Sequence, residues 1–328
     1  MKKKILIIRF SSFGDIVHTR AICPVLKDST DIDSIHWLVR SDLVGALEGD
    51  PAIDEIISFE RQAGLTGLIK LALKLSTQNY DYLYDAHNNI RSLVVRYLFA
   101  LFSSTEIIVR PKDRLKRILL FKFGKNYFPK PYKAMNSYWS PVKSFFKIQR
   151  ELKPIPWPIM PDVEYKNFLE DRVVLVPATA WPMKSWPIEH WKELISLLPN
   201  QKFMILGGPD DKFCQEIADV DPERVVNLAG KLNLKQSSAV AAGAKFIVSA
   251  DTGLQQVADL AGVRGVSLMG PSAFGFTTMG TMKTLEVELG CRPCSKDGRG
   301  KCSQDIYQKC MVEIKPQLVA NEITSALG

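Results

Sequence analysis

The sequence predicts an α/β protein built from two doubly wound domains, each with a parallel sheet. Short apolar, β-branched runs alternate with helical patterns in both halves of the chain, as in repeated βαβ units. A stretch with four prolines, residues 153–161, separates the halves and is typical of a rigid linker. A length of 328 residues is enough for two domains with separate cores. We expect ligands to bind in a cleft between these domains.

The expected elements follow the same order in each half. In the first half, strands are expected at residues 4–10, 35–39, 53–59, 80–85 and 107–109, with helices from residue 16 and at 65–75 and 91–102. In the second half, strands are expected at 173–177, 203–206, 225–227, 246–249 and 265–269, with helices at 188–198, 213–218, 236–242, 254–261 and 316–327. We expect domains at residues 1–155 and 165–328, with the option that the last helix packs back on the first domain.

The first strand and the residues after it are the most informative segment. The apolar run 4–10 ends in a small polar loop, residues 11–15, and a helical pattern begins at Ile16. Such a loop lies at the carboxyl edge of the sheet, where α/β proteins bind ligands. The loop carries one acid, Asp15, beside Gly14, which lets a substrate approach the backbone. Asp15 is therefore a candidate catalytic group, and the alternative is that it only caps the helix.

Composition and missing motifs exclude several classes. The chain is 46% hydrophobic and 24% charged, which is ordinary for a globular protein. No apolar run approaches the roughly 20 residues of a membrane span, and the first strand is too short for a signal peptide. A dinucleotide site needs G-x-G-x-x-G in the first turn, where Gly14 stands alone. We expect a cytoplasmic protein without a nicotinamide or flavin cofactor.

The net charge of +8 is concentrated in residues 110–133, which we call the basic segment. It holds nine Lys or Arg and one acid, Asp113, with apolar and aromatic residues between them. This mixture suits an anionic membrane surface or an anionic lipid. A solvated charged face and a nucleic-acid patch are the alternatives.

Three loops of the second half follow predicted strands and together suggest a nucleotide-diphosphate site. Residues 178–187 include Thr179 and Lys184, and residues 207–211 include Asp211, whose carboxylate suits ribose hydroxyls. Asp251-Thr252-Gly253 opens the helix that continues from Leu254. A helix start offers free N–H groups and the positive end of a dipole, which together bind anions. Each loop alone also fits a plain helix cap.

Four cysteines near the C-terminus have a spacing that two interpretations fit. Cys291, Cys294, Cys302 and Cys310 could hold a structural zinc as four thiolates. The alternative is four free thiols, because a cytoplasmic protein does not rely on disulfides.

Four segments together resemble a known family. KILIIRFSSFGDIVHT, PATAWPMKSWP, SADTGL and the closing CRPC are similar, in the same order, to segments of the lipopolysaccharide heptosyltransferases of glycosyltransferase family 9. The resemblance implies the GT-B fold, in which two Rossmann-like domains face a cleft. It implies an acceptor site in the first domain and a nucleotide sugar, usually ADP-heptose, in the second. The implied reaction is inverting transfer of heptose to the inner core of a lipid A-linked lipopolysaccharide, without a metal or cofactor.

The resemblance also assigns roles to individual residues. Asp15 is implied as the catalytic base. The implied donor-binding residues are Thr179, Lys184, Asp211, Asp251, Thr252, Gly253 and Leu254. The implied acceptor-binding residues are Ser12, Gly14, Arg61, His87, Arg91 and Arg114. We expect a monomer at the inner face of the inner membrane that binds no nucleic acid.

Two departures from the family pattern keep alternatives open. Gln256 stands where the family commonly has His, and His87-Asn88-Asn89 replaces a more usual Gln-Gly start. The first bears on the donor, and the second on whether the acceptor sugar is Kdo or heptose. The other hypotheses are a non-catalytic protein that binds sugar nucleotides or lipids, and a nucleotide-sugar epimerase.

Overall fold

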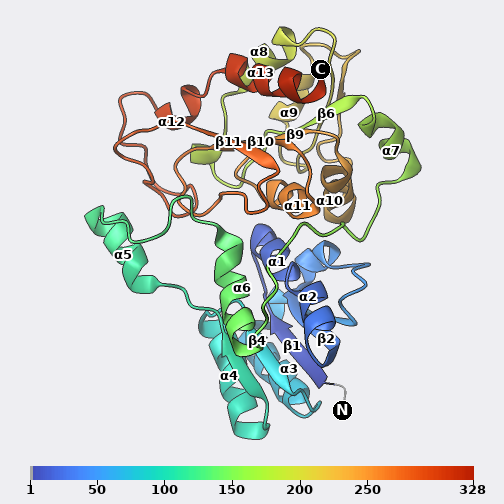
Figure 1. The fold of residues 1–328 in the computed structure, drawn as a ribbon, viewed down its shortest axis with the longest axis vertical. Coiled ribbons are helices and arrows are strands. Elements are labelled where there is room, and N and C mark those ends of the chain that lie inside the picture. Colours follow the sequence, from blue (N-terminus) through green and yellow to red (C-terminus); the bar gives the residue numbers. More distant parts are fainter. Residues whose placement is uncertain (1–2) are drawn as a thin grey trace. The chain divides into compact units, whose positions relative to one another are not determined.

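The computed structural model describes residues 3–328, which divide into two compact units (Figure 1). Unit 1 comprises residues 3–113 and Met135–Lys153. Unit 2 comprises Arg114–Ala134 and Pro154–Gly328. The α/β fold class is confirmed, because each unit is a parallel sheet with helices around it. The segment Arg114–Ala134, which lies within the range expected for the first domain, clusters instead with unit 2.

The sheet of unit 1 has five parallel strands. They are β1 (Lys3–Ile8), β2 (Ile32–Arg40), β3 (Glu55–Phe59), β4 (Tyr82–Asp85) and β5 (Glu106–Val109). Their order is β3-β2-β1-β4-β5, and every pair is parallel. The chain leaves β1 in one direction and later returns to its other side at β4. The carboxyl ends of β1 and β4 therefore form a topological switch point, where such sheets bind ligands.

Helices cover both faces of this sheet. They are α1 (Phe13–Arg20), α2 (Cys23–Ser29), α3 (Gly64–Ser76), α4 (Ile90–Phe102) and α6 (Ala134–Phe145), with the 3₁₀ turns η1 (Ser41–Ala46) and η2 (Arg61–Ala63). Leu83 of β4 packs in one core with Val95 and Phe99 of α4. The next residue, Tyr84, donates a hydrogen bond to the carbonyl of Tyr138 in α6 at 2.7 Å. Because neighbouring strand residues point to opposite faces, α4 and α6 lie on opposite sides of the sheet.

The sheet of unit 2 has six parallel strands. They are β6 (Arg172–Val176), β7 (Lys202–Ile205), β8 (Val225–Asn227), β9 (Ile247–Ala250), β10 (Gly265–Met269) and β11 (Met282–Glu286). The order is β11-β10-β9-β6-β7-β8, so the switch point of this unit lies between β6 and β9. The strand β11 was not expected from the sequence.

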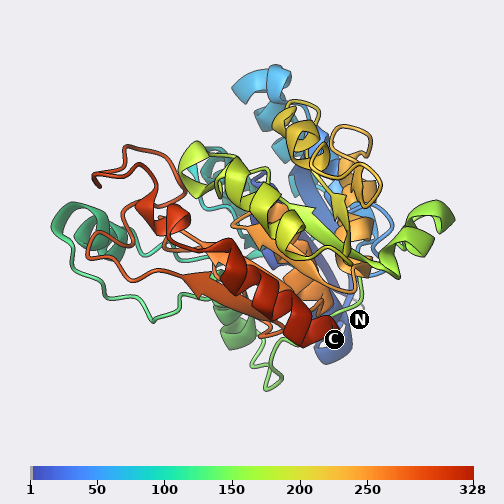
Figure 2. The same cartoon turned by 90° about the horizontal axis from the view of Figure 1, so that it is seen from above.

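Helices also flank the second sheet. They are α5 (Arg114–Phe123), α7 (Val163–Leu169), α8 (Ile188–Leu197), α9 (Phe213–Ala218), α10 (Leu234–Gly243), α11 (Gly253–Ala261), α12 (Lys309–Val312) and α13 (Pro316–Leu327), with the 3₁₀ turn η3 (Pro182–Lys184). Trp186 and Trp191 of the α8 region pack edge to face, with ring centroids 4.9 Å apart, in a core that α9 and α13 share. The last helix, α13, lies along α8 and contacts β10 of its own unit (Figures 1 and 2).

The proline-rich stretch is held against unit 2. The Ile155 N–H donates to the carbonyl of Leu260 at 2.9 Å, and Trp157 is buried. Pro154 lies against Gly262, which ends α11 at a φ of +79°. The expected linker is therefore packed along α11 after the unit boundary at residue 153.

Candidate functional site

The first candidate site is the junction of β1 and α1. The helix begins at Phe13 with Ser12 as its N-cap, so the expectation that residues 13–15 belong to a loop is wrong. Asp15 is the third helical residue and completes a capping box with Ser12. The Ser12 hydroxyl donates to Asp15 Oδ2 at 2.8 Å, and its N–H donates to the same oxygen at 3.3 Å. Asp15 therefore stabilises the helix start and still lies at the switch point.

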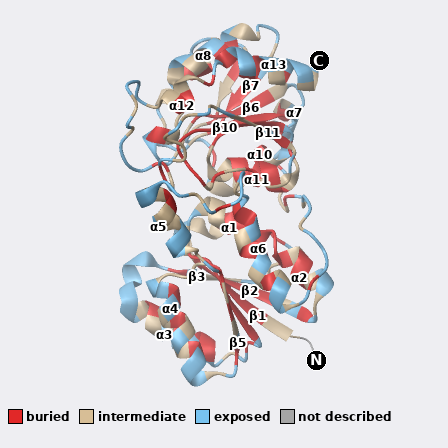
Figure 3. Ribbon diagram, turned by 60° about the vertical axis from the view of Figure 1, so that its left-hand side comes forward, coloured by how far each residue is buried: buried red, intermediate tan, exposed pale blue. Residues whose placement is uncertain are grey.

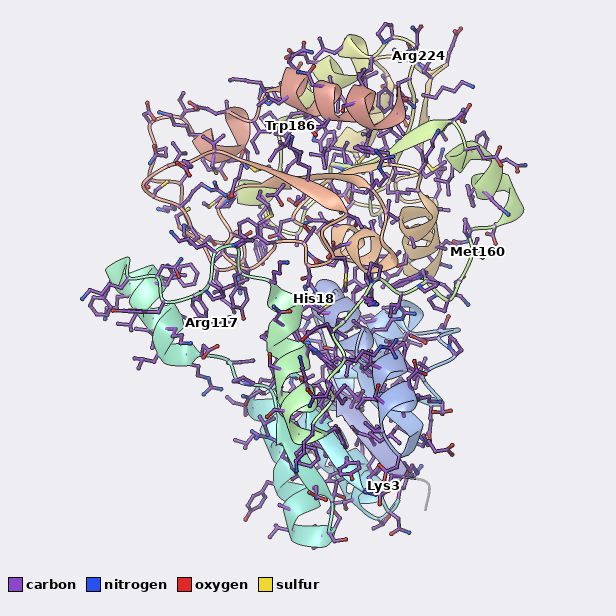
Figure 4. The ribbon with its side chains drawn as sticks, in the orientation of Figure 1. Lys3, His18, Arg117, Met160, Trp186 and Arg224 are labelled. Carbon is purple, nitrogen blue, oxygen red and sulfur yellow. The ribbon has the colours of Figure 1, made fainter. Side chains whose placement is uncertain are left out.

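Two further groups hold the Asp15 carboxylate. The Arg9 guanidinium pairs with Oδ2, and the Tyr138 hydroxyl donates to Oδ1. Arg9 also donates to the carbonyl of Ala86 at 2.9 Å, which ties the end of β1 to the end of β4. The Arg110 guanidinium lies over the Tyr138 ring, 3.5 Å from its centroid. His18, labelled in Figure 4, stacks on the same ring with centroids 5.8 Å apart.

These contacts decide the protonation state of Asp15. Burial alone raises the pKa of the carboxyl, but the Arg9 charge and the Tyr138 hydrogen bond outweigh it. The net result is a pKa well below the ordinary range, and Asp15 stays ionised at physiological pH. The side chain remains 34% exposed, so a substrate can still reach it. Such a carboxylate takes a proton only from a hydroxyl that has already become acidic.

The expected acceptor residues of unit 1 follow three of its strands, β1, β3 and β4. Gly14 lies in the first turn of α1. Burial, together with the Arg9 and Lys112 charges, lowers the pKa of His87 to about 3, so its ring is neutral at physiological pH. Arg91 is exposed in the first turn of α4, and Arg61 is exposed in η2 after β3.

Arg114, also expected to bind the acceptor, is the first residue of α5 and clusters with unit 2. The other expected acceptor residues belong to unit 1. Its assignment to an acceptor site of the first domain therefore remains a prediction from the resemblance alone.

The second candidate site lies at the switch point of unit 2. Lys184 follows β6 and Asp251 follows β9, and their side chains form an ion pair with Nζ 3.1 Å from Oδ2. The Ser272 hydroxyl donates to the same oxygen at 2.6 Å. Both charged side chains are largely buried, at 11% and 14% exposed. Lys184 and Asp251 are 67 positions apart in the sequence, and both were expected at the donor site. The structure brings them into contact.

The start of α11 supplies anion-binding geometry beside this pair. Thr252 is the N-cap, and its hydroxyl accepts the N–H of Gln255 at 3.1 Å. The N–H groups of Gly253 and Leu254 precede the first intrahelical hydrogen bond and point out of the helix. Together with the dipole of this nine-residue helix, they form a geometry that favours an anion.

Two glycines that sequence reasoning missed make room for the ion pair. A Cβ at Gly275 would lie 2.2 Å from Cγ of Asp251, so any side chain there would displace the carboxylate. Gly298, at a φ of +91°, packs against the aliphatic stem of Lys184. A Cβ added at Gly298 would lie 2.5 Å from Cγ of Lys184. Both positions need glycine for close approach rather than for a turn alone.

The remaining residues expected to bind the donor follow strands at the same edge of the sheet. The Thr179 hydroxyl bonds the Ser185 hydroxyl at 2.7 Å. Asp211 follows β7 and accepts the N–H of Gly208 at 2.6 Å, which closes its own loop. Gln256 is buried, and its amide donates to the carbonyl of Gly275 at 2.9 Å. Gln256 thus supports the segment that covers Asp251.

Asp259 anchors a further loop to α11 and gives a testable pH dependence. Its carboxylate accepts the N–H groups of Thr278 at 2.6 Å and Met279 at 3.1 Å. Burial raises its pKa to about 6, although these bonds oppose the shift. Because the pKa is higher in the folded than in the unfolded chain, Asp259 favours folding below about pH 4. That contribution is lost as the pH rises through about 6.

We therefore expect the wild-type protein to gain stability relative to Asp259→Asn as the pH falls from 7 to 4. The expected difference is on the order of 2 kcal/mol, because the pKa of Asp259 is about 6 in the folded chain and about 4 in the unfolded chain. Urea unfolding midpoints at pH 7, 5.5 and 4 measure it. Parallel pH dependence in both proteins would show that Asp259 does not titrate in this range.

The C-terminal cysteines do not form a ligand cluster in the structure. All six cysteines are free thiols, and Cys310 is buried while Cys294 is exposed. Across residues 3–328, no three His, Cys, Asp or Glu side chains are arranged to hold a metal ion. The zinc interpretation of Cys291, Cys294, Cys302 and Cys310 stays a prediction from their spacing.

Comparisons with known proteins agree on one family. Residues 68–308 match the model described as glycosyltransferase family 9 (heptosyltransferase). Lipopolysaccharide heptosyltransferase 1 of Escherichia coli K12 is 27% identical over 297 residues, covering 82% of this chain and 88% of the relative. The structure of E. coli ADP-heptose lps heptosyltransferase II aligns with a TM-score of 0.75 at 22% identity, covering 99% and 98% of the two chains. E. coli heptosyltransferase WaaC with ADP-2-deoxy-2-fluoro heptose aligns with a TM-score of 0.66 at 19% identity, covering 98% and 99%.

These structural matches show the two-domain glycosyltransferase fold that the sequence predicted. The chain belongs to glycosyltransferase family 9 and is an enzyme of the heptosyltransferase type. The epimerase and the non-catalytic binding protein are accordingly not favoured. Among the helices of residues 3–328, none is long and apolar enough to cross a membrane.

Proposed function

We propose that this enzyme transfers heptose from ADP-heptose to the inner core of a lipid A-linked lipopolysaccharide acceptor, with inversion at the transferred carbon. The observation that carries the proposal is the match of most of the chain to the heptosyltransferase family. Two relatives are named lipopolysaccharide heptosyltransferase 1, which supports heptose as the transferred sugar and lipopolysaccharide as the acceptor. The two switch points supply groups that such a reaction requires, an ionised carboxylate and a diphosphate site.

In the proposed mechanism, unit 2 holds the donor. Lys184 and the N–H groups of Gly253 and Leu254 bind the diphosphate, and Asp211 and Thr179 contact the rest of the nucleotide sugar. Charge grows on the diphosphate as its bond to the sugar breaks, so these groups stabilise the transition state. Lys184 would exchange its ion pair with Asp251 for the bound phosphate. This chain's own cation and amides therefore supply the leaving-group stabilisation.

Unit 1 is proposed to supply the base. The acceptor hydroxyl attacks the anomeric carbon, the bond to the diphosphate breaks, and the hydroxyl proton passes to Asp15. Because Arg9 and Tyr138 keep the pKa of Asp15 low, the proton moves late in the transition state, when the new C–O bond is largely formed and the hydroxyl has become acidic. The same two groups orient the carboxylate. Ser12, Gly14, Arg61, His87, Arg91 and Arg114 are proposed to contact the acidic acceptor sugars.

Product mass after incubation with candidate donors and acceptors tests this function. With ADP-heptose, the acceptor should gain the mass of one heptose residue, and UDP- and GDP-sugars should give no product. Parallel Kdo-terminated and heptose-terminated acceptors identify the sugar that is extended. Donor binding without any product would favour the non-catalytic protein, and a donor changed in configuration with no acceptor used would favour the epimerase.

The basic segment is proposed to bring the enzyme to the anionic inner face of the membrane. The structure uses part of this segment for packing, since Leu120 and Phe128 are buried with Phe274 close by. Arg117, labelled in Figure 4, lies over the Phe274 ring at 4.4 Å. Lys122 and Lys125 are exposed and remain suited to lipid headgroups.

We expect Lys122→Gln with Lys125→Gln to weaken binding to anionic vesicles at low salt. Each lysine near the surface contributes about 1 kcal/mol, and salt screens it within roughly 8–10 Å. Vesicle co-sedimentation measures the change, with the exposed pair Lys231→Gln and Lys245→Gln as the control. Equal pelleting of both double variants and the parent would show that these lysines form only a solvated surface.

A further inference from the structure

The helices α3 and α4 are apolar on both their inner and their outer sides. Their inner residues, including Leu68 of α3 and Val95 and Phe99 of α4, pack in the core of unit 1. Their outer side also carries large apolar residues, each between 38% and 80% exposed. We call these residues the α3–α4 surface: Leu65, Leu73, Ile90, Leu93, Tyr97, Leu101 and Phe102. Figure 3 shows much of both helices in pale blue, the colour of exposed residues.

The spacing of these residues makes a continuous stripe rather than scattered contacts. Ile90, Leu93, Tyr97 and Leu101 recur at intervals of three and four, which places them on one side of α4. The two helices pack side by side, so Leu65 and Leu73 of α3 extend the surface. A helix that is apolar all round is normally buried on all sides. A contiguous exposed apolar surface of this kind marks a site of interaction.

The charges of the two helices indicate the partner. Neither Gly64–Ser76 nor Ile90–Phe102 contains an acidic residue. Lys70, Lys74 and Arg91 are exposed on them. Arg96 is the fourth cation of the pair, and the buried carboxylate of Asp85 neutralises it at 2.9 Å. The two helices thus present apolar residues together with cations and no anions. This combination complements a partner with an apolar interior and an anionic boundary.

We propose that the α3–α4 surface docks on an anionic lipid bilayer, with the apolar stripe of α4 inserted among the headgroups and Lys70 and Lys74 against lipid phosphates. This is the behaviour of amphipathic helices that lie in a membrane interface. The surface belongs to unit 1 and is separate from the basic segment, most of which lies in unit 2. Docking by the α3–α4 surface depends on apolar burial as well as charge. It is therefore less sensitive to salt than docking by the basic segment, which depends mainly on charge.

Co-sedimentation of the full chain with vesicles tests the proposal. Vesicles of phosphatidylcholine with phosphatidylglycerol supply the anionic surface, and pure phosphatidylcholine supplies the neutral one. The test variant is Leu93→Gln with Tyr97→Gln and Leu101→Gln, at positions that are 52–63% exposed. The matched control is Ile306→Gln with Tyr307→Gln and Leu318→Gln, at 47–56% exposed in unit 2. A charge variant, Lys70→Gln with Lys74→Gln, tests the cations.

The parent and the control should pellet with anionic vesicles and partition much less onto neutral ones. The apolar variant should lose at least tenfold in partition at low and high salt. The charge variant, which lacks two lysines, should lose about 30-fold at low salt only. Partition of the apolar variant equal to that of the control would overturn the proposal. If the triple variant does not melt like the parent, Leu93→Gln and Leu101→Gln are measured singly, with a smaller loss expected from each.

A second copy of this chain is the competing occupant of the surface. Sedimentation velocity without lipid separates the two, because bilayer docking predicts the same monomeric species for the parent and the apolar variant. A dimer of the parent that the apolar variant abolishes would overturn the proposal. Turnover on a water-soluble acceptor is a separate measurement: it should stay unchanged in the apolar variant. Failure of docking and failure of the proposed reaction are therefore distinguishable.

Discussion

Asp15→Asn should reduce heptose transfer by about 10²–10⁴-fold in kcat while donor binding stays near that of the wild type. Removal of a general base typically costs this much, because no group is left to take the proton from the attacking hydroxyl in the transition state. The Asn amide keeps the shape of the carboxylate, and its oxygen can still accept from Arg9. Turnover at saturating donor, measured by product mass over time, gives the ratio.

Asn is a sharper substitution than Ala at this position. Arg9 is 5% exposed and pairs with Asp15. Either substitution removes the counter-charge, but Asp15→Ala also leaves the Arg9 guanidinium without the hydrogen-bond acceptor that the Asn oxygen preserves. Breaking a buried pair on one side costs several kcal/mol of stability, about 3–5 in well-studied cases. The matched control is Asp50→Asn, since Asp50 pairs with the buried Arg20 in the same unit. Wild-type turnover in Asp15→Asn would reduce Asp15 to a helix-capping residue.

Lys184→Ala should weaken ADP binding by roughly 1.5–3 kcal/mol, which is about 10- to 150-fold in Kd. The substitution removes a charge-assisted bond to the diphosphate. It also leaves Asp251, otherwise paired with Lys184 at 3.1 Å, as an unneutralised anion beside the phosphates. Isothermal titration of ADP into each protein measures the loss.

Lys192→Ala is the control for Lys184→Ala. Lys192 is an ion-paired lysine of the same unit, held by Glu189 of α8 and Glu216 of α9. Its removal should leave the Kd for ADP unchanged. The titration is repeated with EDTA, and the proposed mechanism predicts the same Kd there. A Lys184→Ala protein that binds ADP like the wild type would place the diphosphate elsewhere.

Most of the fold could be predicted because apolar periodicity and turn residues determine it locally. The strand at Gly265–Met269 and the helices at Phe213–Ala218 and Pro316–Leu327 have the bounds that the sequence predicted. Each consists of an apolar pattern between clear breakers. The meeting of the loops after β6 and β9 could also be predicted, because parallel strands bring their carboxyl ends to one edge whatever lies between them. The diphosphate site expected there stays a prediction.

The helices α5 and α6 and the strand β11 could not be predicted, for a physical reason. The sequence of α5 mixes cations with apolar and aromatic residues, α6 contains Pro141, and β11 lacks the apolar run of a buried strand. Packing decides their conformation: Leu120 of α5 is buried beside Phe128, and Tyr138 of α6 is fully buried. Tertiary contacts of this kind override local propensity.

The immediate partners of Asp15 illustrate the same limit. Arg9 stands out in the sequence as a lone cation at the end of a buried strand, which calls for a carboxylate partner. Tyr138 lies 123 positions from Asp15 on an unpredicted helix, and no pattern in the sequence connects the two. Of the two groups that lower the pKa of Asp15, Tyr138 could therefore be found only in the folded chain.

The most direct measurement of the proposed reaction is the anomeric configuration of the product, read by NMR after transfer from ADP-heptose. Direct displacement with Asp15 as base predicts one new glycosidic bond whose anomeric carbon is inverted relative to the donor. A product with retained configuration would require a covalent or ion-pair intermediate and would contradict the role given to Asp15.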